Sequence, residues 1–246
     1  SVYTWGASSQ GQLCIETSEN FVPIPQCISF FAKKKVISIG AGASHVACVV
    51  RNSEGDTEVF TWGNGSKGKL GNNSDKDEKT PYLVESLRGA RALQIGCGSD
   101  FTVMLSARGD VYSWGSGDSG RTGTGSVENV YVPVCLPSFG QVNIIEIAVG
   151  FDHVAAVADN GALYTWGYGS NGRLGHGEEV DLLTPQIVEA LKEEKIVHAS
   201  CGGHHTAVTT ANGLLYTFGW NHYGQLGHGP PCFGGEDSQM VPKLVE

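Results

Sequence analysis

The chain has 246 residues, 40% of them hydrophobic, with a formal net charge of −9 and 35 glycines. Acidic and basic residues are mixed along the chain, which excludes a generic surface for nucleic acid or anionic membranes, because both require clustered Lys and Arg. No apolar stretch approaches the roughly 20 residues that a membrane-spanning helix needs. Glycine is about twice as frequent as usual and forms no low-complexity run, which is typical of many tight turns between short strands.

A motif of the form Tyr/Phe-Ser/Thr-Trp/Phe-Gly recurs along the chain. Its third residue, called the marker below, is Trp5, Trp62, Trp114, Trp166 or Phe218, giving spacings of 57, 52, 52 and 52 residues. A period of roughly 50 residues with several short apolar runs is typical of a β-propeller built one blade per period. We expect one domain over residues 1–246, with repeats near 3–59, 60–111, 112–163, 164–215 and a partial repeat at 216–246.

Within the period 164–215, four short strands are predicted. They begin at Leu163, Gln186, Ile196 and His205, and we expect them to form one four-stranded blade. The dipeptides Asn160-Gly161 and Asn212-Gly213 precede markers and predict type I′ hairpin turns, in which both central residues have positive φ.

The cysteines fall in columns, that is, at equivalent positions of successive periods, that are otherwise filled by Leu, Ile, Val, Ala and Met. We expect buried, unpaired thiols at Cys27, Cys48, Cys97, Cys135 and Cys201. We expect Cys232, in a Gly-rich loop, to be the most reactive of the seven. Unpaired thiols indicate a reducing compartment, so we expect a cytoplasmic or nuclear protein that is not secreted.

Each period carries Trp-Gly-x4-Gly-(Gln/Lys/Arg)-Leu-Gly, then Pro, then Gly-x-x-His. This pattern, present in five registers over essentially the whole chain, resembles the repeat of the regulator of chromosome condensation (RCC) family. The resemblance implies an all-β propeller of four-stranded blades, seven in the family and here an incomplete set. The departures leave the period intact: they are Cys14 for glycine, Thr122 for leucine, Phe101 for histidine and Phe218 for tryptophan.

Catalytic and metal-binding patterns are missing from the sequence. His45, His153 and His205 recur in Gly-x-x-His, but each belongs to a different period, so we expect structural histidines hydrogen-bonded within each blade. Cys201-Gly-Gly-His204-His205 alone does not supply the three or four ligands that zinc needs. There is no nucleophile elbow and no phosphate loop. We expect no metal, no cofactor and no enzymatic activity.

Aromatic residues enter the loop after Trp-Gly only late in the chain. Loops on a rigid scaffold concentrate binding residues, and Trp and Tyr are enriched at protein interfaces. The candidate partner-binding residues are Tyr168, Trp220, His222 and Tyr223, with the variable pairs of Gly-x-x-His, Phe151-Asp152 and Gly203-His204, as weaker candidates. The alternative is packing on the neighbouring blade. We expect this alternative for Trp220, with full burial, and the interface for His222 and Tyr223.

We expect a non-catalytic protein–protein interaction propeller, part of a larger protein or assembly, with protein partners, no direct nucleic acid and no membrane insertion. The family resemblance also implies an alternative, guanine-nucleotide exchange on a small Ran-like GTPase. That activity requires a wedge-like insertion, and the longest excesses over the period, in the first hairpin and around Cys232–Met240, are short. Ultraviolet photoreceptors of plants share the fold, but they require Gly-Trp-Arg-His-Thr where this chain has Gly202-Gly-His-His-Thr206, so light sensing is not expected.

Overall fold

The computed structural model describes residues 1–17, 19–137, 139, 142–229 and 238–246. Within these ranges the chain is all-β, with short antiparallel strands and single 3₁₀ turns and no α-helix. The residues divide into two compact units, one of residues 1–116 and 128–135 and the other of residues 117–127 and 136–246.

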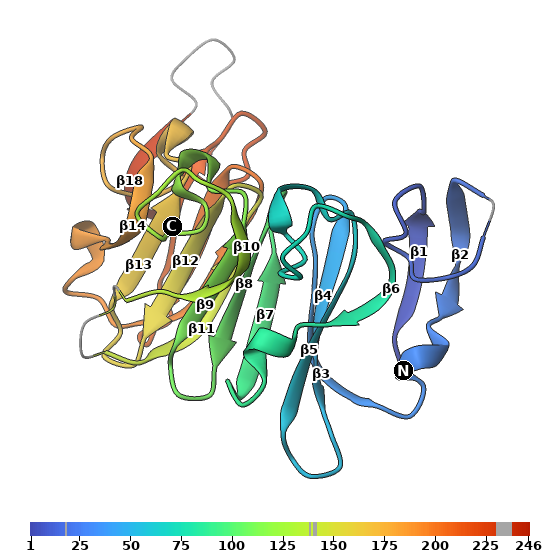
Figure 1. Cartoon of the computed structure of the whole chain (residues 1–246). Helices are drawn as coiled ribbons and strands as arrows, with labels where there is room; N and C mark the ends of the chain where they lie inside the picture. The colour runs from blue at the N-terminus through green and yellow to red at the C-terminus, as the bar shows by residue number, and fades with distance from the viewer. Residues whose placement is uncertain (18, 138, 140–141, 230–237) are drawn as a thin grey trace. The chain divides into compact units, whose positions relative to one another are not determined.

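The first unit contains a strand pair and two four-stranded antiparallel sheets (Figure 1). The pair is β1 (Tyr3–Ala7) and β2 (Phe21–Cys27). One sheet has the order β3 (Lys35–Ala41), β4 (His45–Arg51), β5 (Thr57–Gly63) and β6 (Glu78–Leu83). The other has the order β7 (Ala92–Cys97), β8 (Phe101–Ser106), β9 (Val111–Gly115) and β10 (Val130–Cys135). The 3₁₀ turns are Ser29–Phe31, Ser66–Gly68 and Glu85–Leu87.

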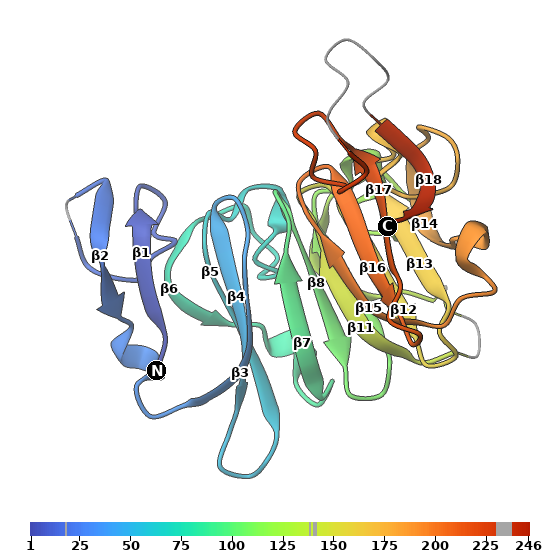
Figure 2. The same cartoon turned by 180° about the vertical axis from the view of Figure 1, so that it is seen from behind.

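The second unit contains two further sheets of the same design (Figure 2). One has the order β11 (Ile144–Val149), β12 (His153–Ala158), β13 (Leu163–Gly167) and β14 (Leu182–Ile187). The other has the order β15 (Ile196–Cys201), β16 (His205–Thr210), β17 (Leu215–Trp220) and β18 (Ser238–Leu244). The 3₁₀ turns of the second unit are Asp118–Gly120, Ser170–Gly172 and Glu189–Leu191.

The sequence repeat and the sheets are out of phase by two strands. The four strands of the period 164–215 are β13 to β16, of which β13 and β14 complete one sheet while β15 and β16 begin the next. The prediction that the four strands of this period form a single blade is therefore wrong, although each full period contributes as many strands as one four-stranded blade contains, as expected. The reason is the hairpin before each marker, which makes the marker strand a hydrogen-bonded neighbour of the last strand of the preceding period.

The hairpins at the two Asn-Gly dipeptides have three-residue loops, not type I′ turns. Gly161 N donates to Ala158 O at 2.9 Å and Ala158 N to Ala162 O at 2.9 Å. Gly161 has a φ of +89° and Asn160 is not among the positive-φ residues. This is a type I turn followed by a left-handed glycine. The same bonding pattern recurs in the hairpins that contain Gly55, Gly109 and Gly213.

The markers of the four complete sheets lie on the third strand and are at most 1% exposed: Trp62, Trp114, Trp166 and Phe218. Apolar clusters lie between adjacent sheets of each unit. In the second unit, for example, Ala155 and Leu163 of one sheet pack with Val208 and Phe218 of the next. Trp5, on β1, is instead 58% exposed. Among the described residues β1 pairs only with β2, so the other edge of β1 is uncovered.

The cysteine prediction is correct in part. Six described cysteines are free, and Cys48 and Cys97 are buried, but Cys27 and Cys135 are exposed and Cys201 is half-buried. Cys27 and Cys135 end the outermost strands β2 and β10, which are covered on fewer sides than the inner strands. Their column is therefore a partly open one and not a core column. Cys232 lies outside the described residues.

Candidate functional site

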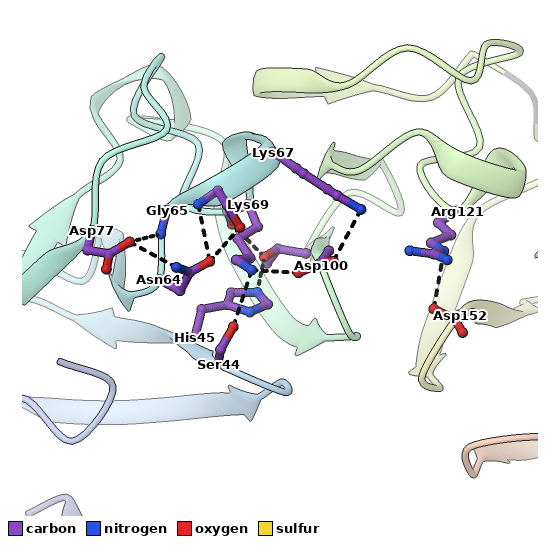
Figure 3. Close-up of polar contacts among 12 residues, drawn as sticks. Ser44, His45, Asn64, Gly65, Lys67, Lys69, Asp77, Asp100, Arg121 and Asp152 are labelled. Atoms are coloured by element: carbon purple, nitrogen blue, oxygen red, sulfur yellow. Dashed lines mark hydrogen bonds and ion pairs between the residues drawn. The ribbon is translucent and has the colours of Figure 1, made fainter. Parts of the chain in front are cut away.

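Two of the loops that follow the markers are closed by a backbone hydrogen bond to an aspartate just before the next strand. Gly169 N donates to Asp181 Oδ1 at 2.8 Å in the second unit. Gly65 N donates to Asp77 Oδ1 at 2.9 Å in the first unit (Figure 3). Added atoms at Gly169 would meet Val180 O at 2.0 Å, so a residue with a side chain does not fit there. These two loops are consequently held by bonds to their own backbone, and the loop after Phe218 is held by a bond from Leu226 N to Asn221 Oδ1 at 3.0 Å.

Three successive loops place a basic residue at the same position, and the first of them is Lys69. Its side chain is almost fully buried, and Nζ lies 2.5 Å from Asp100 Oδ1 and 3.2 Å from Ser44 Oγ (Figure 3). Lys67 Nζ lies 3.4 Å from the other oxygen of Asp100. Burial raises the pKa of Asp100, but the two lysines outweigh this effect and hold the pKa below its ordinary value. Asp100 is therefore a carboxylate that neutralises a buried cation.

In the second unit the first of the two basic residues again pairs with an aspartate, whereas the second does not. Arg121 Nε lies 3.1 Å from Asp152 Oδ1, and Asp152 occupies the same position of Gly-x-x-His as Asp100 (Figure 3). The third basic residue, Arg173, would pair with the next residue of this column, which is His204. A carboxylate partner is thus replaced by an imidazole.

Arg173 is held by neutral groups instead. It is 1% exposed, and its guanidinium donates to Ser170 O at 2.8 Å, Gly203 O at 3.2 Å and Asn171 Oδ1 at 3.3 Å. The guanidinium carbon lies 4.8 Å from the centre of the Tyr168 ring. Burial lowers the pKa of Arg173, and the surrounding Asp152, Asp181 and Glu179 only partly compensate.

Four aromatic side chains of the second unit contact one another near this arginine: His204, Trp220, His222 and Tyr223. Trp220 lies at the centre, with ring-centroid distances of 5.5 Å to His204, 5.3 Å to His222 and 5.4 Å to Tyr223. The His222 ring stacks on Trp220, whereas those of His204 and Tyr223 stand at 87° and 79° to it. We call these four residues the aromatic loop surface.

A pocket of 270 Å³ opens at this surface, lined by Gly203, His204, His205, Trp220, Tyr223 and Gln225. Tyr223 is 77% exposed, and Trp220 and His222 are partly exposed. The prediction that Trp220 is fully buried is therefore wrong. Its indole stands at the end of β17, where Trp220 N bonds His204 O at 2.9 Å and the loop begins to leave the sheet.

The remaining predicted site residues lie outside the ring cluster. Tyr168 covers Arg173, and Asp152 is buried in its ion pair with Arg121. Phe151 is 49% exposed and contributes no ring contact among the described residues. The sequence analysis named Gly203 as a weaker candidate but missed Arg173. The available signal was the column of Asp100, Asp152 and His204, in which the carboxylate is lost opposite the last arginine.

Two of the three recurrent histidines, His45 and His153, have hydrogen-bond partners in the adjacent sheet. The prediction of a partner within the same blade is wrong for both. His45 Nε2 lies 2.8 Å from Thr102 Oγ1, and His153 Nε2 lies 2.8 Å from Thr206 Oγ1. Each threonine hydroxyl donates to a backbone carbonyl, that of Lys69 or Arg173, so the histidine must be the donor to the threonine.

Burial lowers the pKa of both His45 and His153 to about 3, so each ring is neutral at physiological pH. In the part of the chain that the structure describes, no three His, Cys, Asp or Glu side chains gather in a way that could hold a metal ion. Nor does any described helix have the length and apolar character needed to cross a membrane.

Comparison with known proteins gives relatives along the whole chain. The chain is 38% identical over 245 residues to the Ultraviolet-B receptor UVR8 of Arabidopsis thaliana, covering 100% of this chain and 54% of the receptor. It is 35% identical over 230 residues to human E3 ubiquitin-protein ligase HERC2, covering 93% of this chain and 5% of the ligase. The chain thus spans about half the length of the receptor and a small part of the ligase.

Solved structures match the fold. Human WBSCR16 superposes with a TM-score of 0.86 at 25% identity, covering 99% of this chain and 61% of that protein. Yeast RCC1 (Prp20), solved bound to Kap60, superposes with a TM-score of 0.84 at 23% identity, covering 99% and 57%. The family model described as the RCC1-like domain matches residues 1–246. With its four-stranded blades and its recurrent marker, the chain belongs to the RCC1-like domain family, of whose propeller it holds an incomplete set of blades.

Proposed function

We propose that the chain is a non-catalytic protein-interaction propeller whose binding surface is the aromatic loop surface of the second unit. The observation that carries this proposal is the cluster of contacting rings centred on Trp220, with Tyr223 77% exposed. Aromatic side chains on an ordered loop offer large contact area at low entropic cost, and Trp and Tyr are the commonest interface anchors.

The described titratable groups favour binding over catalysis. Burial raises the thiol pKa of Cys48, Cys97 and Cys201 to about 12, so these thiols are not nucleophilic thiolates at neutral pH. His45 and His153 are neutral and each is hydrogen-bonded to a threonine. HERC2 is matched over 5% of its length, so its ligase activity is not carried over to this chain. The free cysteines support a reducing, cytoplasmic or nuclear location.

The proposal is tested by capturing partners with the purified chain and measuring the affinity of each identified partner for three variants. Trp220→Ala and Tyr223→Ala are expected to weaken binding by at least about 2 kcal/mol, or about 30-fold in Kd, the usual threshold for an interface anchor. The control is Leu215→Ala, which is 37% exposed and lies at the opposite end of β17 from Trp220. Unchanged affinity in both aromatic variants, with an unchanged melting temperature, contradicts the proposal.

Guanine-nucleotide exchange on a small Ran-like GTPase stays a second prediction. Its support is the fold that the chain shares, at 23% identity, with yeast Prp20p. The structure of Prp20p is described together with its binding to Gsp1p and histones. One of the two short excesses over the period, around Cys232–Met240, would have to supply the wedge and lies largely outside the described residues. Release of labelled nucleotide from a panel of GTPases, with and without the chain, measures this activity directly.

A further inference from the structure

The aromatic pocket adjoins a buried cation that lacks the carboxylate of its two equivalents. Lys69 has Asp100 at 2.5 Å and Arg121 has Asp152 at 3.1 Å, whereas Arg173 makes its hydrogen bonds to two backbone carbonyls and an amide oxygen within the described part of the chain. Asp152, the carboxylate with the largest effect on the pKa of Arg173, is already engaged by Arg121. A buried charge without a close counter-ion creates a positive field that attracts an external carboxylate.

The pocket is connected to this cation through one residue. Gly203 lines the pocket, and its carbonyl oxygen accepts the hydrogen bond from Arg173 at 3.2 Å. In the preceding period the equivalent residue is Phe151, which carries a large side chain where Gly203 has none. A Cβ built on Gly203 meets nothing within 4 Å, so the space beside this residue is open.

The walls of the pocket are uncharged rings. Burial lowers the pKa of His204 and His205, and the positive charge of Arg173 lowers that of His204 further, so both imidazoles are neutral at physiological pH. Neutral rings standing nearly perpendicular to Trp220 enclose an apolar side chain well. A cationic side chain would gain from the ring faces but would be repelled by Arg173.

We propose that this pocket, between His204, Trp220 and Tyr223, binds an apolar side chain of a partner segment whose flanking residue is Asp or Glu. The rings hold the apolar anchor, and the field of Arg173 selects the adjacent carboxylate in place of the missing column aspartate. This inference rests on the proposed function, because it names the partner chemistry of the same surface.

The test uses the whole chain and short peptides of the form Ser-Gly-Z-Leu-Z-Gly-Ser, in which Z is Glu, Gln or Lys. Binding is followed by NMR through the amide of Gly203 and the indole N–H of Trp220, up to about 5 mM peptide, where weak binding remains measurable. The Glu peptide is expected to bind at least about fivefold more tightly than the Gln peptide, the effect of one partly screened charge pair, with the Lys peptide weakest. The ratio of Glu to Gln affinity is expected to shrink at about 500 mM salt. Replacing Leu by Ala in the Glu peptide is expected to weaken binding.

Two matched pairs of variants separate the parts of the site. Gly203→Phe installs the side chain found at Phe151 and is expected to abolish binding of all peptides, whereas Gly203→Ala leaves most of the space and retains binding. His204→Asp supplies the column carboxylate within the chain and is expected to reduce the Glu-to-Gln ratio to about one or below. His204→Asn removes the ring without adding charge and is expected to keep the ratio above one.

Equal affinity for the three peptides, tighter binding of the Lys peptide, or absence of shifts at Gly203 and Trp220 overturns the inference. So does an unchanged Glu-to-Gln ratio in His204→Asp. These outcomes leave the proposed function standing if Trp220→Ala and Tyr223→Ala still weaken a captured partner. The proposed function is contradicted separately, if neither aromatic substitution changes the affinity for a captured partner.

Discussion

At the scale of single residues, each of two buried tryptophan markers is hydrogen-bonded through its indole to the loop that follows the previous marker. The indole Nε1 of Trp114 donates to Lys69 O at 2.9 Å, and that of Trp166 donates to Arg121 O at 3.2 Å. In the last period Phe218 replaces the marker and cannot make this bond, and Arg173 O accepts only from Thr206 among the described residues. Within the part of the chain that the structure describes, the carbonyl of Arg173 is therefore held by a threonine alone, that of Arg121 by an indole alone, and that of Lys69 by both.

Trp166→Ala is expected to lower the free energy of unfolding by roughly 3–5 kcal/mol, because a fully buried aromatic side chain and its hydrogen bond are lost. Tyr168→Ala is expected to cost under about 1 kcal/mol, because its ring is partly exposed and only stacks on Arg173. Urea unfolding of both variants measures the difference. Equal losses would mean that Tyr168 belongs to the core and not to the surface.

The two buried histidines are expected to make the fold sensitive to acid. Their pKa is about 3 in the folded chain and roughly 6.5 when unfolded, so between these values only the unfolded chain binds the proton. Stability is therefore complete above pH 6.5 and declines as the pH falls, by up to about 1.4 kcal/mol per pH unit for each histidine.

The variant that tests this is His153→Phe, which copies Phe101 at the equivalent position of the preceding period. Unfolding free energies at pH 7.5 and 5.0 are expected to differ less in the variant than in the original chain. An identical difference would show that His153 is protonated in the folded state.

The sequence predicted some features of single residues correctly and others incorrectly. It identified the recurring markers, because a constant period keeps one apolar residue type at one strand position. It misjudged Cys27 and Cys135, because the residue types of a column do not reveal that the column lies on the outermost strand. It found the rings of the candidate surface from their rarity in the loops. It missed Arg173, because the loss of a counter-ion is visible only once the pairs of Lys69 and Arg121 are known.

At the scale of elements, the hairpins before the markers share one geometry in which only a glycine is left-handed. The sequence located the turns correctly, but the Asn-Gly dipeptide is compatible with both a two-residue and a three-residue loop. The choice is made by strand pairing. Val157 pairs with Leu163, which leaves Ala158 and Ala162 to close the loop.

Gly213→Ala is expected to lower the free energy of unfolding by about 1–2 kcal/mol, the cost of a left-handed conformation for a residue with a Cβ. Its φ is +81° and an added Cβ meets nothing within 4 Å, so strain of the backbone is the whole effect. Gly203→Ala is the matched control. Gly203 is equally open but lacks a positive φ, so its substitution is expected to be neutral in the same urea titration. A neutral Gly213→Ala would refute the three-residue hairpin.

At the scale of the whole molecule, stability resides between neighbouring sheets of each unit. Residues of β4 and β5 pack with those of β7 to β9 in the first unit, and residues of β12 and β13 pack with those of β15 to β17 in the second. The repeat and its blade type followed from the sequence, because period and apolar pattern are global properties. The phase of the sheets did not, because four strands in a row can be grouped in more than one way.

Removal of residues 112–163, one full period, is expected to leave a folded chain, because it joins β8 directly to β13 and so pairs two half-sheets of matching kind. Removal of residues 112–136 takes away β9 and β10 alone and joins β8 to β11, which leaves β7 and β8 without their second half. Circular dichroism and the cooperativity of urea unfolding are expected to be retained in the first deletion and lost in the second. Equal behaviour of the two deletions would show that folding does not require the remaining strands to form complete four-stranded sheets.

The half-period offset also bears on how such a gene can change in length. Unequal recombination between any two equivalent codons adds or deletes one period, and the junction always meets a complementary half-sheet, wherever in the period the exchange occurs. Every sheet then contains strands of two ancestral copies. Copy number is therefore free to vary by whole periods without a damaged sheet, whereas a new loop such as the one carrying Trp220 arises within a copy by point substitution. Selection can thus act separately on the number of blades and on the surface of any one of them.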